Sequence, residues 1–253
     1  MPAIVSSTGG HQTGQRGVKL ILANPNAEHR MRNTECGTAM ESSLMNKDDN
    51  SPYHHGNLRA ELLKTAAQQL QLVGVEKLSI RAVSRALGVS QSAPYRHFKN
   101  KNELLAALVK KGFSQLAQCQ RRAKEGLTPT EALSAMGVAY VNFACAHPEL
   151  FKLMFSSQSY CEQNDDPSEP KGEAFSGGEA FNELMATVEE GIQQGYFQER
   201  PSQEVAFAAW SIVHGLAYLT IDYSRIGIPK DATHHLVQSA LDVFMRGVSA
   251  EGK

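Results

Sequence analysis

Apolar residues recur at helical spacing along most of the chain. The first clear stripe consists of Leu58, Leu62, Leu63, Ala66 and Leu70. Gly74 follows this stripe, and glycine readily adopts the positive φ of a residue that ends a helix. The sequence contains no sustained alternation of apolar and polar residues and no short repeat. The pattern therefore predicts an all-α protein.

Residues 79–101 predict two short helices joined by a tight turn. The first helix carries an apolar stripe formed by Ile80, Val83 and Leu87. Ser79 is placed to cap its N-terminus and Gly88 to end it, and Ser90 offers the next capping side chain. Helices joined so tightly cross at a steep angle, which lets one enter a DNA major groove while the other braces it.

The second helix of this pair is predicted to read DNA. It carries polar and aromatic hydrogen-bonding side chains: Gln91, Ser92, Tyr95, Arg96 and His97. Pro94 lies among them, and proline has no backbone N–H, which a helix tolerates only in its first turn. We therefore expect this helix to start late, with Ser92 rather than Ser90 as its cap, or to have an irregular first turn.

Charge is distributed unevenly, although the net charge is only −1. Residues 45–125 hold 14 Lys and Arg against 6 Asp and Glu, whereas residues 126–253 hold 7 against 17. A basic unit attached to an acidic unit is typical of a DNA-binding head on a body that does not bind DNA. Chance segregation on solvated helix faces is the alternative, and the coincidence with the two-helix pattern favours DNA binding.

The remainder of the chain also predicts helices. Thr128 to Glu131 form a capping box with proline at the first helical position, which is a strong signal for a helix start. Residues 156–178 are rich in Ser, Gln, Asn, Asp, Pro and Gly, which predicts a long loop. The expected helices span about residues 102–124, 129–146, 148–155, 179–194, 202–224 and 231–248. The helix over 102–124 would join the head to the body.

The motifs of the head resemble those of a known family. The matching positions are Gly88-Val89-Ser90, Tyr95, His97-Phe98, Lys101 and Glu103-Leu104, with Tyr53-His54-His55-Gly56-Asn57-Leu58 upstream. They are similar to the DNA-binding segment of the tetracycline-repressor (TetR) family of bacterial regulators. One position departs from that family, which most often has a larger apolar residue where this chain has Pro94.

A second group of motifs resembles the C-terminal domain of a TetR subgroup that has a Trp-His-Gly pattern. These motifs are His147-Pro148-Glu149-Leu150-Phe151 and Trp210 with His214-Gly215. The whole resemblance covers about residues 53–248. It implies a three-helix helix-turn-helix DNA-binding head over residues 53–101 and a helical regulatory and dimerisation domain over residues 102–250. Residues 1–52 show no sustained period and are expected to form a disordered extension.

The resemblance also implies that Tyr95 and Lys101 grip DNA phosphates. Gln91, Ser92 and Arg96 suit base edges, since Gln pairs well with adenine and Arg with guanine. The complete predicted contact set is Ser79, Arg81, Ser90, Gln91, Ser92, Tyr95, Arg96, His97 and Lys101. For His97, packing beneath the reading helix together with Phe98 is the stronger alternative.

The resemblance implies that the body binds a small molecule. Its candidate lining residues combine large apolar and a few polar side chains: Tyr140, Phe143, Phe151, Phe155, Trp210 and His214. The same residues could instead form a dry core. For His214 a buried hydrogen bond at a close helix crossing is favoured over ligand contact, and for His147 helix capping is favoured.

The C-terminal region indicates a dimer. Residues 205–219 are apolar almost all round, which exceeds what packing inside one small body uses. The last helix carries an apolar stripe formed by Leu236, Ala240, Leu241, Phe244 and Val248. The resemblance implies that these two helices and their copies form a four-helix interface. A two-fold dimer would place its reading helices about 34 Å apart on a palindromic operator.

The predicted function is therefore a transcriptional regulator that binds operator DNA as a homodimer and is switched by a small-molecule ligand. The resemblance favours a repressor over an activator, because repressors are more common in that family. The alternative is a nucleoid-type helical protein that binds DNA without sequence specificity. An enzyme is not expected, because the sequence contains no Gly-rich phosphate loop, no HExxH and no nucleophile elbow.

No cofactor or metal site is expected. The four cysteines, Cys36, Cys119, Cys145 and Cys161, form no CxxC and are expected to be reduced thiols. A membrane partner is also not expected, because no stretch approaches the roughly 20 apolar residues that a membrane span requires. The expected location is the cytoplasm.

Overall fold

The computed structural model describes residues 58–156, 178–226 and 230–250. Within these ranges every regular element is a helix, and one isolated β-bridge joins Phe197 to Ser249. The prediction of an all-α protein is confirmed. The expected extension over residues 1–52 lies outside the described residues, as do residues 53–57 and most of the loop expected over residues 156–178.

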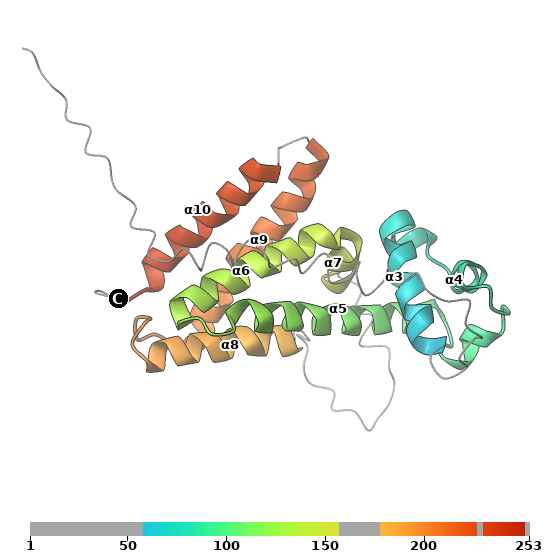
Figure 1. Ribbon diagram of the computed structural model, residues 1–253, viewed down its shortest axis with the longest axis horizontal. Coiled ribbons are helices and arrows are strands. Elements are labelled where there is room, and N and C mark those ends of the chain that lie inside the picture. Colours follow the sequence, from blue (N-terminus) through green and yellow to red (C-terminus); the bar gives the residue numbers. More distant parts are fainter. Residues whose placement is uncertain (1–57, 157–177, 227–229, 251–253) are drawn as a thin grey trace, which may run out of the picture. The chain divides into compact units, whose positions relative to one another are not determined.

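The head consists of α3 (Leu58–Lys77), α4 (Ile80–Leu87) and a 3-10 turn, η1 (Ala93–Arg96). Figure 1 shows them beside the first part of α5 (Lys101–Lys124). Gly74 interrupts α3 with φ 73° and ψ 172°, and the chain then resumes helical geometry as far as Lys77. The expected break at Gly74 is confirmed, because only glycine adopts this backbone conformation without strain.

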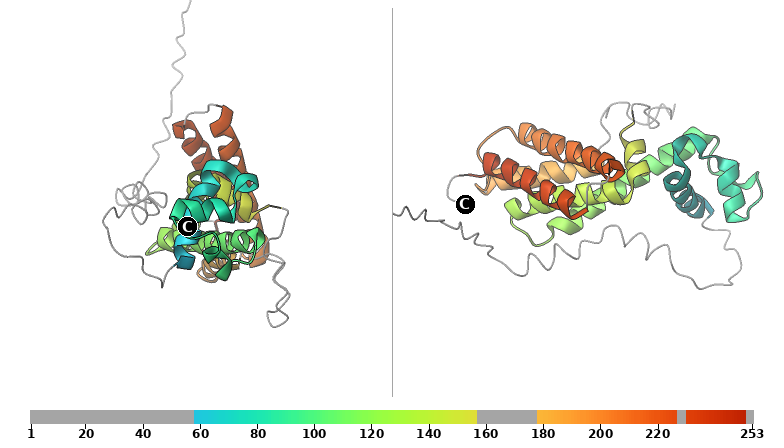
Figure 2. Two further views of the ribbon diagram at one scale, coloured as in Figure 1. Left: turned by 90° about the vertical axis from the view of Figure 1, so that its right-hand side faces the viewer. Right: turned by 90° about the horizontal axis from the view of Figure 1, so that it is seen from above.

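The body contains α6 (Pro129–Ala146), α7 (Pro148–Met154) and α8 (Gly178–Gln193). It is completed by α9 (Ser202–Ile226) and α10 (Lys230–Val248), which run side by side in Figures 1 and 2. The capping box at the start of α6 is confirmed: the Thr128 side chain accepts from the Glu131 N–H, and a Glu131 oxygen accepts from the Thr128 N–H. Local sequence signals therefore set this helix start as expected.

His147 lies at the junction of α6 and α7. Its backbone N–H donates to the Phe143 carbonyl, which ends α6, and its own carbonyl accepts from the Phe151 N–H at 2.8 Å in α7. Its side chain makes no capping hydrogen bond. The expectation that the imidazole caps the helix is wrong, since the main chain and Pro148 make this junction.

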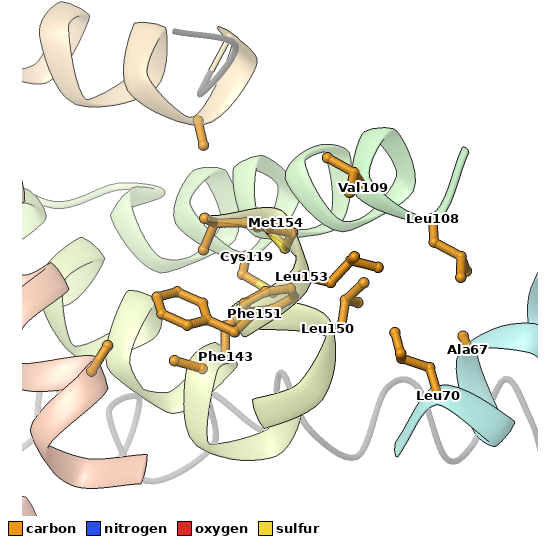
Figure 3. Close-up of a cluster of buried hydrophobic side chains, with 14 of the residues drawn as sticks. Ala67, Leu70, Leu108, Val109, Cys119, Phe143, Leu150, Phe151, Leu153 and Met154 are labelled. Carbon is orange, nitrogen blue, oxygen red and sulfur yellow. The ribbon is translucent and has the colours of Figure 1, made fainter. Parts of the chain in front are cut away.

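One of two hydrophobic clusters among the described residues runs from the head into the body. Figure 3 shows Leu70 of α3 and Leu150 of α7 in one cluster of buried side chains, with Leu108 of α5 beside them. A hydrogen bond between the two helices supports this packing: the Glu149 N–H in α7 donates to the Gln71 side-chain oxygen in α3 at 3.2 Å. The first turns of α7 are therefore tied to the last turns of α3.

Candidate nucleic-acid interface and ligand cavity

The tight turn after α4 has the predicted geometry. The Ser79 hydroxyl accepts a hydrogen bond from the Ala82 N–H at 3.1 Å and caps α4. Gly88 ends the helix with φ 69° and ψ 22°, and its N–H donates to the carbonyls of the last turn. Both capping predictions are confirmed. A side chain at position 88 would be strained in this left-handed conformation.

The predicted reading helix is a single 3-10 turn rather than an α-helix. Ser92 is its N-cap, Pro94 is its second residue, and no side chain caps it. The Pro94 carbonyl accepts from the N–H groups of both His97 and Phe98 at 2.9 Å, which closes the turn. The late start and irregular first turn are confirmed. Ser90 does not act as the cap, and its hydroxyl lies 3.3 Å from that of Ser92.

Most of the predicted DNA-contacting side chains lie on the exposed surface of the head. The exposed ones are Arg81, Ser90, Gln91, Ser92, Tyr95 and Arg96. His97 is half-buried and Phe98 is 1% exposed. This agrees with the alternative interpretation of both as packing residues. Within the part of the chain that the structure describes, neither Arg81 nor Arg96 is ion-paired with a carboxylate. Both guanidinium groups can therefore meet phosphates or bases.

Lys101 joins α5 to the end of α3. Its ammonium group donates to the Glu76 carbonyl at 3.0 Å. Next to it, the Asn100 side chain caps α5 by accepting from the Glu103 N–H at 2.9 Å. An ammonium has three N–H donors, so two remain beyond the bond to Glu76, at a helix N-terminus where the backbone favours anions. The sequence carried no signal for the contact with Glu76.

The body contains a cavity between α5, α6, α8, α9 and α10, with a free volume of about 40 Å³. Three of the predicted lining residues face it: Tyr140, Phe155 and Trp210. Phe143 and Phe151 do not line the cavity and are fully buried in the adjoining core. His214 also lies outside the wall and contacts Tyr140 instead. The six predicted residues thus divide between the cavity, the core and a polar contact.

Tyr140, Trp210 and His214 form a hydrogen-bonded network at one side of the cavity. The Tyr140 hydroxyl accepts a hydrogen bond from the Trp210 indole N–H at 3.3 Å and lies 2.9 Å from Nδ1 of His214. Burial raises the pKa of Tyr140 far above its usual value of 10, so the phenol stays protonated. Burial also lowers the pKa of His214, which favours the neutral imidazole. The hydrogen bond foreseen for His214 is present.

Gln120 is the cavity residue that the sequence did not reveal. It lies on α5, is 5% exposed and faces the cavity, and its side-chain oxygen has no hydrogen-bond partner among the described residues. Its neighbours Gln118 and Arg121 are exposed. In sequence the polar stretch looks like a solvated helix face, so no pattern could single out the one residue that turns inward.

The last two helices present apolar side chains to solvent. Phe207 and Leu219 of α9 are 60% and 50% exposed, and Leu236 and Val243 of α10 are 52% and 74% exposed. The stripe predicted on the last helix divides, because Leu241 and Phe244 face the cavity while Leu236 is exposed. The outward face of α10 therefore includes Leu236 of the predicted stripe together with Val243, which the stripe did not contain.

One described helix is long and apolar enough to cross a membrane, judged by length and composition alone. It is the segment Ser202–Asp222 of α9, so the expectation that no such stretch occurs is wrong. Val205, Ala209, Val213 and Ala217 of this segment are buried, and α9 packs against α6, α8 and α10. One face of the helix therefore lies against the body, and the other face is exposed.

The described residues contain no group of three or more His, Cys, Asp and Glu side chains that could hold a metal ion. Cys119 is disulfide-bonded, so the expectation of reduced thiols is wrong at this position. Cys145 is exposed and is not disulfide-bonded.

Two family models match the chain. One, described as bacterial regulatory proteins of the tetR family, matches residues 62–108, and the other, described as a tetracyclin repressor-like C-terminal domain, matches residues 133–244. Together they cover the head and most of the body. The descriptions do not specify the Trp-His-Gly subgroup, which stays a prediction.

Named relatives match part of the chain. An HTH-type transcriptional regulator of Mycobacterium tuberculosis is 29% identical over 103 residues, which is 40% of this chain and 44% of the relative. The class C tetracycline repressor protein of Escherichia coli is 47% identical over 51 residues, which is 20% of this chain and 23% of the repressor. Each match spans less than half of the relative's length.

Solved structures match most of the chain. A protein of unknown function from Rhodococcus sp. RHA1 is 32% identical, with a TM-score of 0.65 over 79% of this chain and 99% of that one. The TetR family transcriptional regulator PfmR from Thermus thermophilus is 20% identical, with a TM-score of 0.51 over 76% of this chain and 99% of that one. The second likeness shows a shared fold.

Proposed function

Because the chain belongs to the tetracycline-repressor (TetR) family of bacterial regulatory proteins, we propose that it is a cytoplasmic transcriptional repressor. In this proposal the head binds operator DNA, two copies form a homodimer, and a small molecule in the body cavity changes DNA affinity. The observation that carries it is the exposed polar surface of α4 and η1, which includes arginines without carboxylate partners in the described chain.

The head has the groups that DNA binding requires. Tyr95 is 47% exposed, so its hydroxyl can donate to a phosphate while the ring still packs on the head. Arg96 and Gln91 are exposed beside it and can present bidentate groups to base edges. Lys101 extends the same surface with a charge at the N-terminus of α5.

The dimer is supported by the outward face of α9. Phe207, Ser211, Gly215 and Leu219 are exposed and four residues apart, so they lie on one side of the helix. A Cβ atom at Gly215 would meet nothing within 4 Å. Small residues flanked by large apolar ones let a second helix approach closely, which favours a copy of the chain over a lipid surface as the occupant.

The proposed control of DNA affinity by a ligand is supported by the position of α5. This one helix carries Lys101 in its first turn and Gln120 near its end, so it links the proposed DNA contact to the cavity. A ligand can alter DNA affinity only if it prefers one of two arrangements of the heads. In this proposal a ligand that displaces α5 at Gln120 also displaces Lys101 relative to the DNA.

Competition binding tests the proposal. We expect the protein to prefer DNA from the region upstream of its own gene to random DNA of equal length by about 10³-fold or more. Light scattering should give the mass of a dimer. Affinity that falls with salt but ignores sequence would instead support the nucleoid-type alternative, and a monomeric mass would contradict the dimer.

A further inference from the structure

Within the proposed regulator, we infer that the cavity takes an uncharged, largely apolar molecule whose hydroxyl or N–H group donates to the side-chain oxygen of Gln120. This inference rests on the proposed function and names the class of ligand. It depends on the juxtaposition of one buried acceptor with an otherwise apolar wall.

The acceptor on Gln120 is unsatisfied in the described structure. Its oxygen is buried, faces the cavity and accepts no hydrogen bond. A buried acceptor without a donor destabilises a protein, and most such groups in folded proteins are paired. A donor that enters with the ligand would satisfy it. Water could do the same only where other polar groups help to hold it, and the wall around Gln120 is mainly apolar.

The other polar groups of the wall already have partners. The Tyr140 hydroxyl accepts from the Trp210 indole and lies within hydrogen-bonding distance of His214. The phenol hydroxyl and the indole N–H therefore already have hydrogen-bond partners within the protein. Gln120 is left as the group that can select a ligand by hydrogen bonding, which makes one donor the polar requirement of the site.

The absence of charge in the cavity wall defines the rest of the ligand. No lining residue carries a formal charge, and Leu116, Met136, Val213 and Leu241 are typical of its composition. An ion would lose its hydration here without gaining a counter-charge, so an uncharged molecule is favoured. The aromatic side chains Phe155 and Phe244 extend the apolar surface.

The free volume of about 40 Å³ is smaller than most ligands, so binding requires side chains to move. Met136 and Met245 line the cavity, and methionine changes rotamer readily because it is unbranched. Phe155 and Phe181 are half-buried and can also be displaced. The site is therefore expected to accept more than one molecular shape, provided that a donor reaches Gln120.

Matched pairs of probes test the requirement for a donor. Indole is compared with benzofuran, which has nearly the same shape without an N–H. 1-Octanol is compared with its isomer heptyl methyl ether, which has no hydroxyl. We expect the donor of at least one pair to bind the full-length protein about five- to tenfold more tightly than its partner, in titration calorimetry.

Two variants assign the preference to one residue. Gln120→Leu removes the acceptor at similar volume, and it should abolish the difference within each pair while apolar binding remains. Gln115→Leu is the matched control, because Gln115 lies on the same helix and also has a buried oxygen without a partner among the described residues, but it does not line the cavity. It should leave the preference intact. Circular dichroism confirms that both variants fold.

Several outcomes would overturn the inference. It fails if both members of each pair bind equally to the original protein, if Gln120→Leu retains the preference, or if no probe binds. The DNA competition assay is independent of these probes. Promoter preference without donor preference would refute the ligand class alone, and loss of promoter preference would refute the proposed regulator.

Discussion

The hydroxyl of Tyr140 in α6 lies 2.9 Å from Nδ1 of His214 in α9. Tyr140 is 3% exposed, and burial lowers the pKa of His214 below its usual value of 6.5. The neutral imidazole suits this contact, because a protonated ring would place an unpaired charge beside a buried phenol. The same direction of shift, with the same cause, holds for His147 at the junction of α6 and α7.

These two histidines predict that stability falls in mild acid. The unfolded chain takes up protons near pH 6.5, whereas the folded chain resists them because both pKa values are lowered. The free energy of unfolding should therefore fall as pH drops below about 6.5 towards the folded-state pKa values, and level off below them. Urea unfolding at about pH 7.5, 6.5 and 5.5 measures this slope.

A substitution assigns the slope. His214→Asn removes one of the two titrating groups, so its stability should depend less steeply on pH than that of the original protein. Its stability at neutral pH should be lower by about 1 kcal/mol, since the contact with Tyr140 is lost or weakened. Identical slopes for the two proteins would contradict the role assigned to His214.

Gln120 predicts a gain in stability on substitution. Gln120→Leu replaces a buried amide whose oxygen has no partner in the described chain with an apolar group, so the free energy of unfolding should rise by about 1 kcal/mol. Gln118→Leu is the control, because Gln118 is exposed on the same helix and its substitution should change stability by less than about 0.5 kcal/mol. Urea denaturation compares them. A destabilised Gln120→Leu would indicate that the amide is satisfied in solution.

The exposed face of α10 predicts the effect of a charge on assembly. Val243 is 74% exposed, so Val243→Glu should leave the fold of each protomer intact while placing a charge in the proposed dimer interface. We expect the dimer to dissociate at least about tenfold more readily, measured by sedimentation velocity. Leu72→Glu is the matched control, since Leu72 of the head is 83% exposed and lies outside α9 and α10. Equal association of the two variants would exclude α10 from the interface.

Sequence reasoning succeeded where structure depends on near neighbours. Ser79, Gly88 and Thr128 act on N–H and carbonyl groups within four residues, so their types and spacing were enough to predict helix ends. The effect of Pro94 was predictable for the same reason, because its missing N–H removes a helical hydrogen bond whatever the tertiary structure. The domain bounds implied by the family resemblance stay a prediction.

Sequence reasoning was weaker where several helices cross. α5 contacts both the head and the body, so an apolar stripe cannot tell which further residues turn inward, and Gln120 was missed. The stripe on α10 divided for a related reason, because the positions of α6 and α9 decide that Leu241 faces inward and Leu236 outward. Such choices depend on long-range packing, which no local period contains.

Two cationic residues of the head predict different effects on DNA binding. Lys101→Ala should weaken binding to every sequence and reduce the slope of log affinity against log salt by about 1, because one phosphate contact is lost. Arg96→Ala should cost about 1–3 kcal/mol at one base position and relax the preference there. Competition binding at several salt concentrations, with operator variants changed at single positions, separates the two.

The control for both is Arg122→Ala, which removes an exposed charge about 30 Å further along the same helix. It should leave affinity, salt slope and base preference unchanged. Lys101 also ties α5 to the Glu76 carbonyl, so the unfolding midpoint of its variant must be measured at the same time. If Lys101→Ala and Arg96→Ala reduced affinity equally for all sequences, the assignment of one residue to the phosphates and the other to the bases would be wrong.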